Sequence, residues 1–457
     1  MMKLKHNFKK GLAFVLTFAM IAGLVPAMSG GANTVQAAIG SGTEPSVSAY
    51  ATKDQLMTAF TPDANGTATT KGKLVFGKNS SGEAQEWYIL GKDSGVSGDN
   101  TILFAASPIA RGQKFEDDWQ HNKTYDASYG VYTSKPTDVY PNHYGASELR
   151  AALQNMATNE SYFTTAEQGL MNDTTVTTKD TKNSKTYTTA DKLYALAADG
   201  YGVSYKTIKA GSDNSTVLAR SNYWSSGDGF WLRSPYDPSY VGSKDSALYA
   251  DPRVCVDKEY LNIGIVVQPA SNLKLSSVLF ASAAKAASDY TSEAVRISSG
   301  KAMTLRLDGT GKDIGTVTYN TTTGDIKVVK GSTAQTVSLV VQGNDGTNDW
   351  YYSKQITGPE TINASDIKSA LSLTSDIDLS ACKIWLEITE DNVSYAVNAE
   401  KEIEKINTTY VTKDELMTAF EPNANGTETN YGKLVFGKNS SGEAQEWYIL
   451  GKDSGVS

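Results

Sequence analysis

The chain has few of the residues that build metal centres and cross-linked scaffolds. Its 457 residues include three histidines and two cysteines, Cys255 and Cys382. Two cysteines placed in different predicted domains exclude a disulfide framework, and so few histidines disfavour a zinc site. We expect no metal and no cofactor, and we interpret both cysteines as buried thiols. A catalytic thiol would need a nearby base, for which the sequence offers His121 and His143 after its N-terminal segment.

Basic residues are also scarce, since 42 Lys and Arg stand against 50 Asp and Glu, giving a net charge of −8. Without a basic stripe to neutralise phosphates, nucleic acid is disfavoured as a partner. Long hydrophobic runs are absent after the first residues, so we expect no membrane span in the mature chain. Abundant Asn, Thr, Ser, Gly and Tyr are typical of soluble β-rich proteins with many polar turns.

The N-terminus has the pattern of an export signal. Four lysines precede an apolar run from Gly11 to Val25, and small residues follow at Val35-Gln36-Ala37. We expect a signal peptide over residues 1–38 and an extracellular or cell-surface protein. The alternative is a membrane anchor, although the apolar run is short for a span of about 20 residues.

A stretch near the start recurs at the end. Residues 50–97 and 410–457 align with seven mismatches at a constant offset of 360 residues. Near-identity of this kind indicates a recent duplication. We interpret 403–457 as the first part of a second copy, and the simplest hypothesis is a truncated gene product.

Periodicity divides the rest of the chain. Residues 39–49 are a Ser- and Gly-containing linker, and 50–284 combine strand-like runs with helices predicted at Thr52–Phe60, Ser147–Ala157 and Thr164–Met171. From Ala294 to Val397 apolar and polar residues alternate with period two between turn sequences, which predicts a β-sandwich over 285–402.

A series of motifs in the first domain resembles a known family. In order they are WYILG at 87–91, TILFA at 101–105, SELR at 147–150, YF at 162–163, WLRSP at 231–235 and QPASNL at 268–273. They resemble a domain family of unknown function common in secreted and surface proteins of Gram-positive gut bacteria. More distantly, the layout is similar to C-type-lectin-like folds of the formylglycine-generating type, although Gln268 stands where Arg is usual. The resemblance implies an α+β C-type-lectin-like domain, followed by an all-β Ig-like sandwich in a multidomain chain.

The segment Asn222–Tyr240 is the most distinctive, because large aromatics alternate there with Gly, Asp and Pro. Aromatic faces pack on sugar rings and Arg offers paired donors, so it can line a binding surface. The candidate ligand-binding residues are Trp224, Trp231, Arg233, Tyr236 and Tyr240. The alternative for Trp231 and Arg233 is a core residue and a structural ion pair.

Catalytic residues are harder to find. Glu116, Asp117 and Asp118 lie beside Trp119 and His121, and paired carboxylates serve acid–base chemistry on glycans. Adjacent acidic residues are more often a solvated loop. We therefore expect a secreted or surface-displayed binding protein for a glycan or protein ligand. The alternatives are a secreted hydrolase or oxidase using the acidic loop or Cys255, and a structural spacer.

Overall fold

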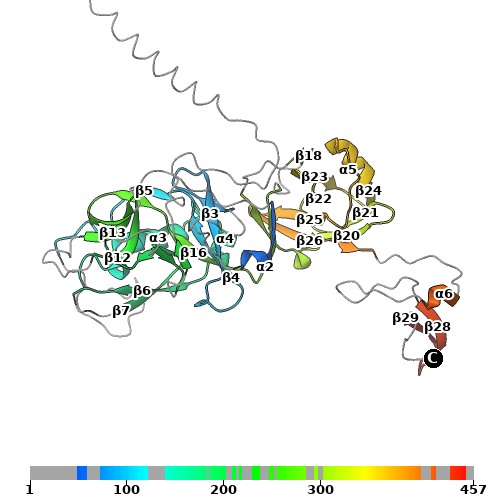
Figure 1. Cartoon of the computed structure of the whole chain (residues 1–457), viewed down its shortest axis with the longest axis horizontal. Helices are drawn as coiled ribbons and strands as arrows, with labels where there is room; N and C mark the ends of the chain where they lie inside the picture. The colour runs from blue at the N-terminus through cyan, green and yellow to red at the C-terminus, as the bar shows by residue number, and fades with distance from the viewer. Residues whose placement is uncertain are drawn as a thin grey trace, which may run out of the picture. The chain divides into compact units, whose positions relative to one another are not determined.

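The computed structural model of the chain describes residues 49–58, 73–121, 139–182, 184, 186–201, 208–212, 216–218, 229–236, 246–251, 255–284, 293–296, 302–402, 413–417 and 433–448. Within these ranges the chain is mostly β-structure in several sheets, and its helices are few and short (Figure 1). No helix in the described part is long and apolar enough to span a membrane.

The expected fold class, an α+β lectin-like domain followed by an Ig-like sandwich, is wrong. Across residues 50–284 the helices have four, ten and six residues and form no layer of their own. The same region contributes strands to several separate sheets. Its β-branched and aromatic residues favour strands, and no uninterrupted 3.6-residue pattern is long enough to form a helical layer.

Two five-stranded sheets dominate this region. One has the order β2-β3-β4-β16-β8 and the other β14-β13-β12-β15-β5. The first comprises β2 (Lys73–Lys78), β3 (Ala84–Gly91), β4 (Asn100–Ala105), β16 (Ala270–Lys274) and β8 (Leu193–Tyr194). The second comprises β14 (Cys255–Tyr260), β13 (Ser246–Asp251), β12 (Phe230–Pro235), β15 (Ile265–Val267) and β5 (Ala110–Gln113).

Smaller sheets complete the region. A hairpin and a three-stranded sheet are formed by β6 (Thr174–Lys179) with β7 (Thr186–Asp191), and by β9 (Ala197–Ala198), β10 (Ile208–Ala210) and β11 (Thr216–Leu218). One large hydrophobic core, which includes Trp87, Phe104, Leu153 and Trp231, lies among these elements.

The helices begin where the sequence predicts. Ser147 caps α3 (Glu148–Ala157) by accepting a hydrogen bond from the Arg150 backbone N–H at 3.1 Å. Thr164 and Glu167 form a complete capping box at the start of α4 (Thr165–Leu170). Thr52 caps α2 (Lys53–Leu56), which ends four residues short of the predicted limit.

An eight-stranded sheet connects the two predicted domains. Its order is β1-β17-β19-β26-β25-β22-β23-β18. The strands are β1 (Tyr50–Thr52), β17 (Val278–Ser282), β19 (Thr304–Asp308), β26 (Val393–Asn398), β25 (Lys383–Glu390), β22 (Val337–Asn344), β23 (Asp349–Ile356) and β18 (Glu293–Arg296). Because β17 pairs with both β1 and β19, residues on either side of the predicted boundary at 284 share this sheet. The boundary itself stays a prediction.

One face of this sheet shares a core with a four-stranded sheet and a helix. The partner sheet contains β24 (Glu360–Asn363), β21 (Asp325–Lys330), β20 (Gly315–Asn320) and β27 (Glu400–Lys401), and the helix is α5 (Ala364–Leu371). Leu339 and Val341 of β22 meet Ile326 and Val328 of β21 in this core. Burial alternates along β21 as the sequence predicts, whereas β22 is buried on both faces from Val337 to Gln342.

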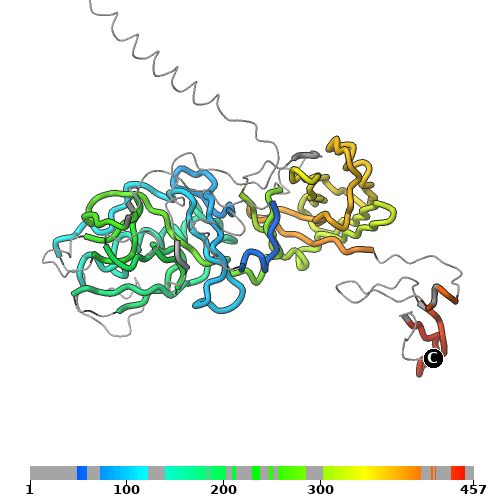
Figure 2. The backbone as a smooth tube through the Cα atoms, in the orientation of Figure 1, coloured from blue at the N-terminus to red at the C-terminus, as the bar shows by residue number. Residues whose placement is uncertain are grey.

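The duplicated sequence forms the same hairpin twice. β28 (Lys433–Lys438) and β29 (Ala444–Tyr448) pair with the register of β2 and β3, including an irregularity at the same place. Figure 2 draws this second hairpin in red near the C-terminus. The Trp87 indole donates to the Phe76 carbonyl at 2.6 Å, and the Trp447 indole donates to the Phe436 carbonyl at 2.7 Å. A short helix, α6 (Lys413–Leu416), repeats α2. Local sequence therefore determines this hairpin.

Candidate functional site

Strand β12 places two of the predicted ligand-binding residues inside the protein. Trp231 is 1 % exposed, donates its indole N–H to the Gln113 carbonyl at 2.8 Å, and packs edge-on against Phe115. Leu232 beside it is fully buried. Trp231 is therefore a packing residue in this structure, as the alternative interpretation of the motif has it.

Arg233 is buried with Trp231 but lies at the floor of a pocket. It is 1 % exposed, and its Nη1 donates to the Ala195 carbonyl oxygen at 2.7 Å. Its guanidinium carbon lies 5.8 Å from the centre of the Tyr194 ring. Burial lowers the pKa of Arg233, because removing the guanidinium from water disfavours its charged form. The backbone carbonyl and the ring compensate part of that cost.

The pocket beside β12 has a volume of about 270 Å³, and polar and apolar atoms line it in nearly equal share. Its walls come from β6, the residues around β9 and β10, and the end of β12. The lining residues are Thr177, Thr178, Lys179, Thr181, Ala197, Ala198, Asp199, Gly200, Tyr201, Lys209, Arg233, Ser234, Pro235 and Leu248. A pocket of this size holds one small ring or one side chain, since drug-sized sites run from about 300 to 1,000 Å³.

An aromatic pair lies at the edge of this pocket. Tyr201 is 52 % exposed, and its ring meets that of Tyr236 edge-on with centroids 5.3 Å apart. The Lys258 ammonium lies 4.5 Å from the centre of the Tyr236 ring. Tyr236 is a residue that the sequence predicts for the site, and its ring contacts Tyr201, which no sequence motif indicates. Tyr201 presents the exposed aromatic surface.

Polar groups accompany this aromatic surface. Lys209 and Asp199 form an ion pair with a Nζ–Oδ1 distance of 2.7 Å, and both side chains are partly exposed. The Ser234 hydroxyl donates to the Ala198 carbonyl at 3.0 Å and accepts from the Ala198 N–H at 2.9 Å. The pocket thus offers a cation, an anion and hydroxyl groups within one small volume.

Several predicted positions lie outside this pocket or outside the described residues. Trp224 and Tyr240 fall in residues that the structure does not describe, so their role stays a prediction. Cys255 begins β14, and its side chain is likewise not described.

The predicted acidic loop does not line the pocket. Asp117 pairs with Lys114 at 2.6 Å, and Asp118 lies 2.7 Å from Nδ1 of His121. Glu116 is buried and accepts a hydrogen bond from the Asp118 backbone N–H. Each of these acidic side chains has a local partner, an arrangement that fits a structured surface turn. Among the described residues no group of three or more acidic, His or Cys side chains could hold a metal ion.

A buried polar cluster lies at the end of β7, the strand that pairs with the pocket wall β6. The Arg150 guanidinium lies 2.6 Å from Asp191, and neither side chain reaches far into solvent. Burial raises the pKa of Asp191, and the Arg150 cation and hydrogen bonds oppose that rise. Burial also raises the pKa of Tyr144 and lowers that of His143 to about 3. The cluster joins α3, β7 and the residues before α3, and so positions the β6–β7 hairpin that forms one wall.

Comparison with known proteins places the pocket in one recognisable domain. Residues 116–275 match a domain of unknown function (DUF6273), and every residue lining the pocket lies inside that range. No curated protein and no solved structure matches the chain. The match therefore defines a domain and assigns it no activity.

Proposed function

We propose that this protein is exported and that its DUF6273 domain binds a glycan without turning it over. The observation that carries the proposal is Tyr201, an aromatic ring that is 52 % exposed beside a pocket of about 270 Å³ with both polar and apolar lining. The ring of its neighbour Tyr236 contacts it edge-on. Export is inferred from the basic and apolar pattern of the first 38 residues.

The chemistry of the pocket fits one sugar ring. The apolar C–H face of a pyranose packs on an aromatic ring such as Tyr201. Lys209 supplies donors, Asp199 supplies acceptors, and the hydroxyls of Thr177 and Thr181 supply both. Thr181 Oγ1 is buried and has no hydrogen-bond partner among the described residues, so a ligand hydroxyl that reached it would satisfy it.

Duplication suits a binder of this kind. A shallow site that holds one ring binds weakly, with a dissociation constant on the order of millimolar, about −4 kcal/mol. A second copy of such a site on one chain would raise the effective concentration of the ligand without any new contact. Residues 410–457 repeat residues 50–97, which lie before the DUF6273 match and include none of the residues that line the pocket.

A glycan array probed with the mature chain tests the proposal. We expect binding to a limited set of glycans, lost in Tyr201→Ala and reduced in Lys209→Ala. Tyr260→Ala is the matched control, because Tyr260 is 59 % exposed in the same domain and does not line the pocket. If the chain bound a protein and no glycan, the proposed ligand class would be wrong and a protein ligand would take its place. Turnover of a bound glycan, abolished by Asp117→Asn or Cys255→Ser, would replace binding with catalysis.

A further inference from the structure

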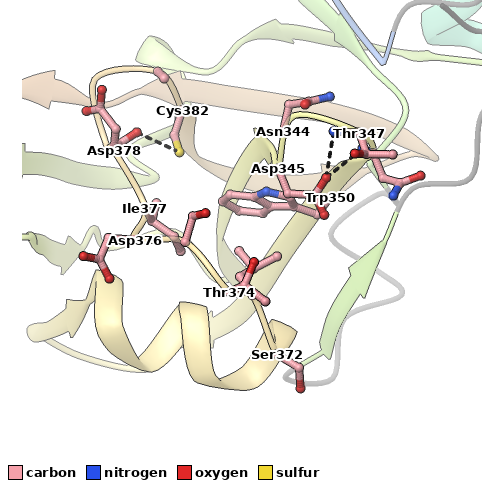
Figure 3. A pocket seen from close by; sticks show the side chains of 14 residues that line it. Asn344, Asp345, Thr347, Trp350, Ser372, Thr374, Asp376, Ile377, Asp378 and Cys382 are labelled. Atoms are coloured by element: carbon pink, nitrogen blue, oxygen red, sulfur yellow. Dashed lines mark hydrogen bonds between the residues drawn. The ribbon is translucent and has the colours of Figure 1, made fainter. Parts of the chain in front are cut away.

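A second pocket, of about 570 Å³, lies between the turn that joins β22 to β23 and the loop that follows α5. Figure 3 shows the Trp350 indole between the turn carrying Asn344 and Asp345 and the loop carrying Thr374. We infer that this pocket binds a neutral, hydroxyl-rich ligand of the carbohydrate class, independently of the pocket beside β12. It lies outside residues 116–275, so the domain match does not assign it.

The floor of this pocket contains a hydrogen-bond donor without an acceptor. Trp350 is 2 % exposed, and its indole Nε1 has no hydrogen-bond partner among the described residues. A β-carbon on Gly343 would collide with this indole, so the backbone beneath it leaves the ring little room to move. A buried N–H left unpaired destabilises the folded chain. An acceptor oxygen would satisfy it, either from a ligand that enters the pocket or from the loop after a small inward shift.

The walls offer neutral hydrogen-bonding groups. Thr347, Asn348, Thr374 and Ser375 are exposed, and the described residues give their side chains no hydrogen bond. Hydroxyl and amide groups both donate and accept, which matches the hydroxyls of a sugar. Their placement on two facing segments allows contact with both edges of one ligand.

The charged groups at this pocket already have partners in the chain. Asp345 accepts from the backbone N–H groups of Thr347 and Asn348 at 3.0 and 2.8 Å. Asp378 accepts from the Ser380 hydroxyl at 2.6 Å, and Asp376 pairs with Lys368 at 2.7 Å.

Two consequences for the ligand follow from these pairs. Hydrogen bonds from Lys368 and Ser380 lower the pKa values of Asp376 and Asp378, so both carboxylates carry charge at neutral pH. These negative charges oppose an anionic ligand. Because each carboxylate already accepts hydrogen bonds from groups of the chain, the carboxylates do not favour a cationic ligand either.

Half-buried apolar side chains complete the inner surface. Leu373, Ile377 and Cys382 line the pocket beside Trp350. Burial raises the pKa of the Cys382 thiol to about 12, so at neutral pH the thiol is uncharged and contributes apolar surface. The apolar floor matches the C–H face of a sugar ring, and the neutral polar groups of the walls, beside carboxylates that already have partners, match its hydroxyls.

The test uses the mature chain carrying Tyr201→Ala, so that the pocket beside β12 does not contribute. The probes are neutral hexasaccharides of glucose, mannose, xylose and N-acetylglucosamine, with hexagalacturonate and hexalysine as charged probes. We expect at least one neutral hexasaccharide to bind in a calorimetric titration. Its affinity should fall about tenfold, equivalent to ~1.4 kcal/mol, in Thr374→Val and in Trp350→Phe.

Thr316→Val is the matched control, since Thr316 is exposed on β20 and does not line the pocket. Thr374 is also exposed, so its variant tests the pocket even if Trp350→Phe weakens folding. The inference is overturned if no neutral probe binds, or if binding is equal in the Thr374→Val, Thr316→Val and parent chains. Preferential binding of hexagalacturonate or hexalysine would overturn it as well.

Discussion

Arg306 and Glu387 form an ion pair 2.9 Å long in which neither side chain has any exposed surface. The Arg306 guanidinium also donates to the carbonyl oxygens of Ser282 and Ala284, at 3.3 and 2.9 Å. The Trp385 indole donates to the same carboxylate of Glu387. One buried cation therefore connects β19 and β25 with the end of β17, across the predicted domain boundary.

Replacing one partner of this pair should lower the free energy of unfolding more than replacing both partners. Glu387→Leu leaves the Arg306 cation buried without its carboxylate, and we expect unfolding free energy to drop by about 3–5 kcal/mol. The double variant Arg306→Met, Glu387→Leu should recover a large part of that loss, because no charge stays buried. Urea unfolding of the three chains measures both effects. A single variant within ~1 kcal/mol of the parent would show that the pair has little part in holding the sheet.

Acid should weaken the first domain through His143. Burial lowers the pKa of His143 from 6.5 to about 3, so protonation favours the unfolded chain. The stability that the neutral His143 contributes to the folded chain is complete above pH 6.5 and is lost progressively as the pH falls toward 3. Between pH 7 and pH 5 this amounts to about 2 kcal/mol for one group.

Thermal unfolding of the parent and of His143→Gln across that pH range measures the effect. The carboxylates titrate alike in both chains, so the difference in stability between the two chains isolates the contribution of His143. We expect the parent to lose more stability than the variant on acidification. Equal losses in the two chains would refute this assignment.

Two glycines in the first hairpin provide a matched pair. Gly77 and Gly82 have φ values of +70° and +79°, a backbone region in which a β-carbon costs about 1 kcal/mol. A β-carbon on Gly77 would also collide with the Phe163 ring and lie 2.7 Å from the Tyr162 carbonyl oxygen, whereas one on Gly82 meets no atom within 4 Å.

Gly77→Ala should therefore be the more damaging substitution. We expect Gly82→Ala to cost about 1 kcal/mol and Gly77→Ala to cost a further 1–3 kcal/mol from overpacking. Chemical denaturation of the two variants compares them directly. If both lowered stability by the same amount, the close packing of β2 against Phe163 would be wrong.

Cys382 should react slowly in the native chain. It is a free thiol whose pKa burial raises to about 12, so little thiolate is present at pH 8. In a Cys255→Ser background, a disulfide reagent should modify Cys382 far more slowly in the folded chain than in denaturant. Similar rates in the two conditions would contradict the burial of this thiol.

Local sequence signals predicted local structure well. The capping residues Ser147 and Thr164 mark the starts of α3 and α4, and the alternation in Asp325–Lys330 predicts the strand β21. The two copies of one hairpin have the same register because their strands and turn are identical in sequence. These features depend on contacts between residues near each other in the chain.

The fold class and the candidate site depended on distant contacts. Tyr201 meets Tyr236 across 35 residues of chain, and no periodic pattern announces such a pair. The sequence signal for β6, which forms a pocket wall, is an unbroken run of β-branched residues from Thr174 to Thr178, in which Thr174, Val176 and Thr178 are buried. The lectin-like fold was predicted from the order of sequence motifs. Motif order shows which side chains are present, but it does not determine how many strands join each sheet.

The central claim is that the exposed face of Tyr201 contacts a glycan, and a titration of four chains tests it most directly. The best glycan from the array is titrated into the parent, Tyr201→Phe, Tyr201→Ala and Tyr260→Ala chains. The account predicts parent-like affinity for Tyr201→Phe and Tyr260→Ala, because both keep the ring at position 201, and about a tenfold or greater loss for Tyr201→Ala. Equal affinity in Tyr201→Ala and Tyr260→Ala would contradict it.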